Sequence, residues 1–119
     1  LSPDDLIPEL RIDAELLPAE VSLETAELIG SLEPYGMGNP RPVFLLRGAR
    51  VLESNILKER HLRMRLSAGG ITFDTVGFNL SSRTPKGDTV DIAFSMDINV
   101  WNGRRSLRLR IKDLREAVD

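Results

Sequence analysis

Basic side chains that alternate with apolar ones are the residues of this sequence best suited to chemistry. Arg63 and Arg65 alternate with leucine and methionine, and Arg108, Arg110 and Lys112 alternate with leucine and isoleucine nearer the C-terminus. A period of two places one set on each face of a β-strand, so both segments present a basic face. Guanidinium groups bind phosphate oxygens bidentately, and clustered cations attract polyanions. The same pattern is also typical of an ordinary solvated strand, so both interpretations stay open.

Further candidate nucleic-acid ligands flank these strands. Proteins that bind single strands stack bases on aromatic rings. Trp101 and Tyr35 are candidate platforms, although Trp101 fits a lid over the core slightly better and Tyr35 could pack locally. We expect Ser54–Arg60 to form a basic loop after the first strand. The predicted ligands outside the basic strand faces are Lys58, Arg60, Arg104, Arg105, Trp101 and Phe78.

The residue inventory points away from catalysis. His61 is the one histidine and cysteine is absent, so neither a Ser–His–Asp or Cys–His set with a spare base nor a usual zinc site can be built. We expect His61 to lie on the polar strand face as a spectator, with contact to a phosphate as the alternative. Asp88 and Asp91 fit a solvated segment better than a weak cation site. The sequence predicts no enzymatic activity, no metal site and no cofactor in this chain.

Length and composition bound the type of protein. The 119 residues fit one domain, and 41% hydrophobic with 29% charged residues is typical of a soluble globular protein. No apolar run is long enough to cross a bilayer, and the acidic first residues lack the features of a signal peptide. We therefore expect a cytoplasmic protein without membrane contact. A leucine at position 1 suggests a fragment of a longer protein.

Charge divides the chain into two unlike parts. Residues 1–42 contain nine acids and two arginines, whereas residues 43–119 contain fourteen basic residues and nine acids. We predict an N-terminal arm, one short helix and a joint in residues 1–42, followed by a β domain in residues 43–119. The basic excess of the second part is the electrostatic footprint of a polyanion binder.

Residues 1–42 are interrupted by prolines. The first twenty residues predict an extended arm with at most one short strand near residues 10–16. Ser22 can cap a helix from Leu23 to Leu32, whose apolar stripe, with Leu28 among its members, needs a partner surface. Proline and glycine then end the helix and fix the path of the chain into the first strand. The predicted structural joint comprises Pro34, Tyr35, Gly36, Gly38, Asn39, Pro40, Pro42 and Phe44.

The second part predicts five strands. Residues 44–53 form the first, bent by a bulge at Gly48, and residues 61–67 and 71–78 form the next two. Residues 79–88 form a loop with room for one helical turn. Residues 90–100 and 107–112 form the last hairpin, in which Asn102 and Gly103 favour a type I′ turn. Phe73 and Phe94 should lie in the core. The pattern predicts a mainly β protein, a five-stranded Greek-key barrel of OB type, with a thin β-sandwich as the alternative.

One long motif resembles a known family. Residues 32–44 read Leu-Glu-Pro-Tyr-Gly-Met-Gly-Asn-Pro-Arg-Pro-Val-Phe, similar to the Leu-x-Pro-Phe-Gly-x-Gly-Asn-Pro-x-Pro-x-Phe signature of the RecJ single-stranded-DNA-specific exonucleases, which are DHH phosphoesterases. Tyr35 replaces the usual phenylalanine, which adds only a hydroxyl group. Further similarity lies in residues 12–16, 76–78, 90–91 and 99–103.

The resemblance implies a role in a larger enzyme. It implies an OB module that holds single-stranded DNA while the 5′ end reaches a distant nuclease site in the DHH domains, which use Mn²⁺ or Mg²⁺ and are absent from this chain. It also implies a bacterial cytoplasmic protein of DNA repair and recombination. The alternative is an OB-like module that contacts other domains or proteins but not nucleic acid.

Overall fold

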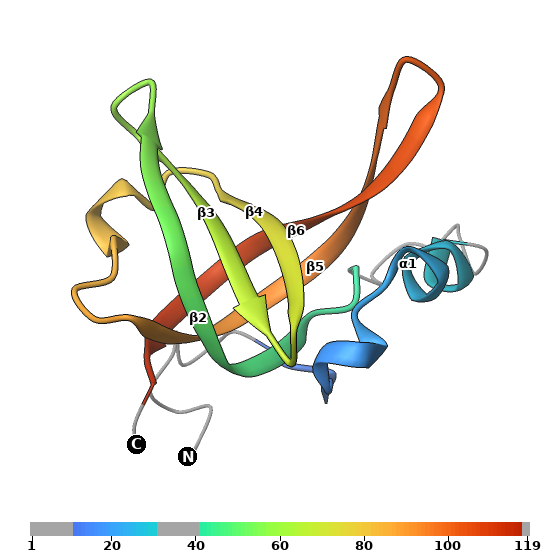
Figure 1. Ribbon diagram of the computed structural model, residues 1–119, viewed down its shortest axis with the longest axis horizontal. Helices are drawn as coiled ribbons and strands as arrows, with labels where there is room; N and C mark the ends of the chain where they lie inside the picture. Colours follow the sequence, from blue (N-terminus) through green and yellow to red (C-terminus); the bar gives the residue numbers. More distant parts are fainter. Residues whose placement is uncertain (1–10, 31–40, 118–119) are drawn as a thin grey trace.

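The computed structural model describes residues 11–30 and 41–117. Five barrel strands follow a short N-terminal region (Figure 1). Their bounds are β2 Phe44–Leu57, β3 His61–Ala68, β4 Ile71–Gly77, β5 Thr89–Trp101 and β6 Arg104–Glu116. They are hydrogen-bonded in the order β2-β3-β4-β6-β5, and β5 pairs again with β2, which closes the barrel. The predicted mainly β OB barrel is confirmed, and the alternative β-sandwich is wrong.

A bulge lets β2 belong to both sides of the barrel. The pairing of β2 with β5 shifts register between Leu46 and Ala49. Gly48 lies between them with φ of +68°, a conformation that L side chains rarely adopt. Its N–H donates to Asp91 Oδ1 at 2.8 Å. Because the strand bends here, its first half pairs with β5 and its second half with β3. The predicted bulge is confirmed.

The predicted loop at residues 54–60 is wrong in its first half. Antiparallel pairing of β2 with β3 continues to Leu57 opposite His61, so β2 is longer than predicted. The turn that follows contains Lys58 and Glu59, both with positive φ, and Arg60. Lys58 and Arg60 therefore lie at the tip of a hairpin rather than in a broad loop. The Asn102-Gly103 turn of the other long hairpin has φ of 49° and 76°, as a type I′ turn requires.

The core lies inside the barrel. Phe73 and Phe94 are buried, as predicted, and the Phe94 ring packs at a tilt against Phe44 with centroids 6.1 Å apart. Phe44, the last residue of the predicted joint, thus begins β2 inside the core. Asp91 is buried as well, opposite Arg115 of β6, with 3.0 Å between Oδ2 and Nε. The prediction of a solvated Asp91 is wrong, because closure of the barrel at the bulge covers this carboxylate.

The N-terminal arm runs alongside β2. A short strand β1, Ala14–Glu15, pairs with it in parallel, within the predicted range. Asp13 N–H donates to the Val43 carbonyl at 2.7 Å, and Val43 N–H donates to the Asp13 carboxylate at 2.8 Å. The arm is thereby fixed to the chain just before β2, next to Pro42. The other joint residues, Pro34, Tyr35, Gly36, Gly38, Asn39 and Pro40, lie outside the described residues.

One helix packs on the β5–β6 hairpin. Helix α1, Leu23–Gly30, starts at Ser22, whose Oγ accepts from Thr25 N–H at 3.1 Å as predicted for a cap. Ala26 is buried, but Leu28 is exposed, so the predicted apolar stripe is narrower than expected. The predicted end of the helix at Leu32 lies outside the described residues. Within residues 11–30 and 41–117, no helix is long and apolar enough to cross a membrane.

The connection between β4 and β5 contains one short turn of 3-10 helix, Ser81–Arg83. This matches the predicted single helical turn. Arg83 forms an ion pair with the buried carboxylate of Asp113 and donates to the Leu114 carbonyl, both on β6. The Arg83 side chain therefore holds this connection against β6. The hairpins β2–β3 and β5–β6 project beyond the same end of the barrel (Figure 1).

Candidate nucleic-acid interface

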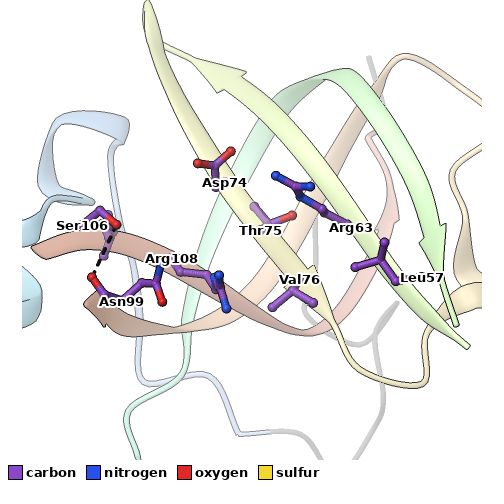
Figure 2. A pocket seen from close by; sticks show the side chains of 9 residues that line it. Leu57, Arg63, Asp74, Thr75, Val76, Asn99, Ser106 and Arg108 are labelled. Atoms are coloured by element: carbon purple, nitrogen blue, oxygen red, sulfur yellow. Dashed lines mark hydrogen bonds between the residues drawn. The ribbon is translucent and has the colours of Figure 1, made fainter. Parts of the chain in front are cut away.

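A groove lies between the outer face of β3 and β4 and the projecting part of the β5–β6 hairpin. It exists because β4 and β6 pair only at Thr75–Leu109 and Val76–Arg110, while the residues of β6 that precede Leu109 project from the barrel with β5. Its volume is about 370 Å³. Figure 2 shows the lining side chains, which come from both walls. The lining residues are Leu57, Arg63, Asp74, Thr75, Val76, Asn99, Ser106, Leu107 and Arg108.

Two of the predicted ligands face this groove from opposite walls. Arg63 comes from β3 and Arg108 from β6. Arg65 lies on the same outer face, opposite Asp74 of β4. Within the described part of the chain, no ion pair or hydrogen bond engages these three exposed guanidinium groups. They are therefore available to phosphate oxygens, which guanidinium groups bind with two parallel hydrogen bonds.

Four polar residues of the groove were missed by sequence reasoning. They are Asp74 and Thr75 of β4, Asn99 of β5 and Ser106 of β6. Ser106 Oγ donates to the Asn99 carbonyl at 3.5 Å, across the hairpin. The sequence carried one usable signal, because Asp74 alternates with the inward-facing Phe73 and Thr75. It did not show that this strand face borders a groove, since that depends on where β6 leaves the barrel.

Trp101 and Arg104 extend the groove toward the hairpin tip. They lie opposite each other at the ends of β5 and β6, and strand alternation puts Trp101 on the face that carries Asn99. Trp101 is 72% exposed, so the interpretation of this residue as a lid over the core is wrong. An indole so far from the core is free to stack on a base.

Phe78 takes part in a small cluster at the end of β4. The Arg110 guanidinium carbon lies 4.9 Å from the centroid of the Phe78 ring, and the His61 ring approaches the edge of the ring at 5.2 Å. His61 Nδ1 accepts a hydrogen bond from Asn79 N–H at 3.0 Å. His61 therefore stabilises the turn that follows β4, a structural contact that the sequence did not indicate. One face of Phe78 already carries Arg110.

The remaining predicted ligands do not gather in the groove. Arg105 points to the other side of the hairpin, where it forms a 3.1 Å ion pair with Glu27 of α1. Lys112 is part of a separate basic group with Arg110 and Arg41. Burial, followed by the neighbouring Arg110 and Arg41 charges, lowers the pKa of Lys112 below 10.5, while Asp97 opposes the shift.

The described residues offer nothing typical of a metal centre. In residues 11–30 and 41–117, no three histidine, cysteine, aspartate or glutamate side chains gather as ligands for an ion. What the site offers instead is a set of guanidinium groups, an exposed indole and a few hydrogen-bonding groups around a groove. This combination can bind a chain of phosphates and bases.

Comparison with known proteins agrees with this arrangement. A family model described as the RecJ OB domain matches residues 12–113, which is most of the chain. The chain belongs to the RecJ OB domain family. The resemblance carried by the motif at residues 32–44 is thereby confirmed.

Relatives and solved structures support the same assignment. The single-stranded-DNA-specific exonuclease RecJ of Salmonella typhimurium is 34% identical over 96% of this chain, which spans 20% of that protein. A crystal structure of Thermus thermophilus RecJ in complex with Mg²⁺ matches 87% of this chain and 16% of its own, with 31% identity and a TM-score of 0.65. The corresponding Mn²⁺ complex matches 76% of this chain and 13% of its own, with 35% identity and a TM-score of 0.58. The RecJ OB domain thus spans about a fifth or less of these relatives.

Proposed function

We propose that this RecJ OB domain binds single-stranded DNA in the groove between the β3–β4 face and the β5–β6 hairpin. The observation that carries the proposal is the pair of exposed arginines, Arg63 and Arg108, on opposite walls of the groove. A phosphate chain that enters the groove meets guanidinium groups on both sides. Arg65 and Arg104 continue the basic surface beyond the groove.

Stacking would select single strands over duplex. Trp101 can receive a base only when that base is not already stacked inside a double helix. Phe78 offers a second apolar surface next to Arg110, and the Lys112 charge is close to that of Arg110. Lys58 and Arg60 at the tip of the β2–β3 hairpin, and Arg105 beside α1, would add long-range attraction rather than direct contacts.

In the parent protein, the bound strand would be guided to a nuclease centre outside this chain. We infer a single-stranded-DNA exonuclease of DNA repair and recombination that degrades 5′ to 3′ in the bacterial cytoplasm. Its DHH domains would hold the Mn²⁺ or Mg²⁺, the two ions named for the Thermus thermophilus structures. The OB domain would supply strand binding and no catalytic residue. The division at residue 42, with the joint between arm and barrel, remains part of the proposal.

Salt-dependent binding tests the proposal. Fluorescence anisotropy of a labelled thymine oligonucleotide would compare the unaltered chain with a variant carrying Arg63→Gln and Arg108→Gln, between 50 and 200 mM NaCl as roughly the range in which such contacts change most. Each lost phosphate contact lowers the slope of log affinity against log salt by about 0.7, so the double variant should lose about 1.4. Affinity at low salt should fall along with the slope.

A matched control separates position from net charge. Arg11→Gln with Arg50→Gln removes the same two charges from exposed sites outside the groove. This control should keep most of the affinity and slope. Equal losses in both double variants, or no binding of the unaltered chain at low salt, would contradict the proposal. The second result would favour the alternative of a protein-interaction module.

A further inference from the structure

One acidic side chain lies in the otherwise basic groove. Asp74 lines it from β4, where it is paired with Arg65 of β3, and Arg108 of β6 lines the same groove. Its side chain is exposed. Within the described part of the chain, no ion pair or hydrogen bond engages the Asp74 carboxylate. Asp74 thus presents a free acceptor in a groove that also carries Arg63 and Arg108 (Figure 2).

The chemistry of a carboxylate restricts what can lie beside it. An ionised carboxylate only accepts hydrogen bonds, and it repels a phosphate, which is also an anionic acceptor. A DNA strand in this groove would therefore place its phosphates at the arginines and a base at Asp74. The groove volume of about 370 Å³ is within the range of sites that hold small organic ligands, so a base has room.

Unpaired bases differ in the donors that they present. Guanine has adjacent N1–H and N2 amino donors, which match the two oxygens of a carboxylate. Cytosine and adenine present one amino group, whereas thymine presents one N–H between two carbonyl oxygens that the carboxylate would repel. Single-strand recognition commonly uses this base edge, because it is free of a pairing partner.

We propose that Asp74 reads an unpaired base in the groove through its exocyclic amino group, and that guanine is preferred over thymine. The inference rests on the proposed single-strand binding and adds to it a base preference. Arg63 and Arg108 would hold the neighbouring phosphates, while Asp74 accepts from the base edge. Asn99 and Ser106 line the opposite wall and can bond the remaining polar atoms of the base.

Three oligonucleotides test the preference. They are labelled thymine 12-mers in which one internal base is thymine, guanine or the base of inosine, which lacks the N2 amino group of guanine. The unaltered chain should bind the guanine oligonucleotide at least about fivefold more tightly than the all-thymine one, which is the lower limit for a bidentate base contact. Inosine should give an intermediate affinity. Anisotropy titration at low salt measures all three.

Two variants that each remove one negative charge show whether the base preference depends on Asp74. In Asp74→Asn the guanine-to-thymine ratio should fall to within about twofold, because the amide can donate to thymine and has one acceptor only. Asp88→Asn, an exposed aspartate outside the groove, should keep the ratio. Far-UV circular dichroism would verify that both variants are folded.

Different failures have different meanings. If the unaltered chain binds all three oligonucleotides equally, or if Asp74→Asn strengthens binding to all of them by the same factor, Asp74 only repels phosphate and the base contact is refuted. Single-strand binding as such would survive that result. If no oligonucleotide binds at low salt, the proposed function fails and this inference fails with it.

Discussion

Replacing Asp91 by alanine should destabilise the barrel far more than replacing Glu15 by alanine. Both carboxylates meet an arginine Nε at 3.0 Å, Arg115 in the first case and Arg47 in the second. The two pairs differ in burial. The side chains of Asp91 and Arg115 are 2% and 7% exposed, whereas those of Glu15 and Arg47 are 50% and 31% exposed. The comparison therefore sets a buried ion pair against an exposed one with the same distance between nitrogen and oxygen.

The expected magnitudes follow from this difference. Removing one partner of a buried pair costs about 3–5 kcal/mol, and an exposed pair contributes about 0–1 kcal/mol. Asp91 also accepts from the Gly48 N–H at the β2 bulge, so Asp91→Ala removes that hydrogen bond as well. We take about 3 kcal/mol for Asp91→Ala, which corresponds to a fall in Tm of roughly 10–15 °C for a domain of this size. Glu15→Ala should lower Tm by less than about 5 °C.

Urea denaturation followed by circular dichroism measures both variants. The midpoints are comparable if the dependence of the free energy of unfolding on urea is unchanged. A double variant, Asp91→Ala with Arg115→Met, should recover part of the loss, because it also removes the buried cation. The reasoning is refuted if Asp91→Ala and Glu15→Ala differ by less than about 1 kcal/mol, the ordinary range for exposed pairs.

Two further predictions concern Trp101 and Lys112. Trp101→Ala should weaken oligonucleotide binding by about 1–3 kcal/mol, the usual worth of a stacked base, and leave Tm nearly unchanged; a large fall in Tm would mean that the indole stabilises the fold. Burial and the charges of Arg110 and Arg41 lower the pKa of Lys112 in the folded state below 10.5. At neutral pH the charged amine therefore destabilises the folded protein. This destabilisation disappears as the pH rises toward 10.5, where the amine loses its proton in the unfolded chain as well. Lys112→Met should therefore be more stable than the unaltered chain at pH 7, in denaturation experiments, and the difference should shrink near pH 10.5; a difference that does not change with pH would contradict this prediction.

Local signals predicted the elements well. Alternation located all five barrel strands, because a period of two is imposed by strand geometry itself. Ser22 as a helix cap, Gly48 as a bulge and Asn102-Gly103 as a tight turn each depend on the properties of one or two residues. These features are independent of distant parts of the chain, so a sequence can show them directly.

The predictions from sequence failed where contacts between residues distant in the chain determine the structure. The end of β2 was placed too early because Ser54 and Asn55 favour loops, while pairing with β3 keeps them in the strand. Asp91 was expected to be solvated because it alternates with apolar residues along the strand. Closure of the barrel instead buries both faces of β5 at this position. For Trp101 the sequence left open a lid over the core or a platform for a base, and the exposed position on the hairpin excludes the lid.

The sequence by itself determined the strands, the basic faces and, through the motif at residues 32–44, the RecJ family. Only the tertiary structure decided which basic residues meet. Arg63 and Arg108 are far apart in the chain. They become the two walls of one groove because β6 pairs with β4 only at Leu109 and Arg110, while its preceding residues project from the barrel. Asp74 is exposed in the same groove, whereas the long hairpin turns Arg105 toward α1. Alternation shows which residues share a strand face, but closure of the barrel determines which faces oppose each other.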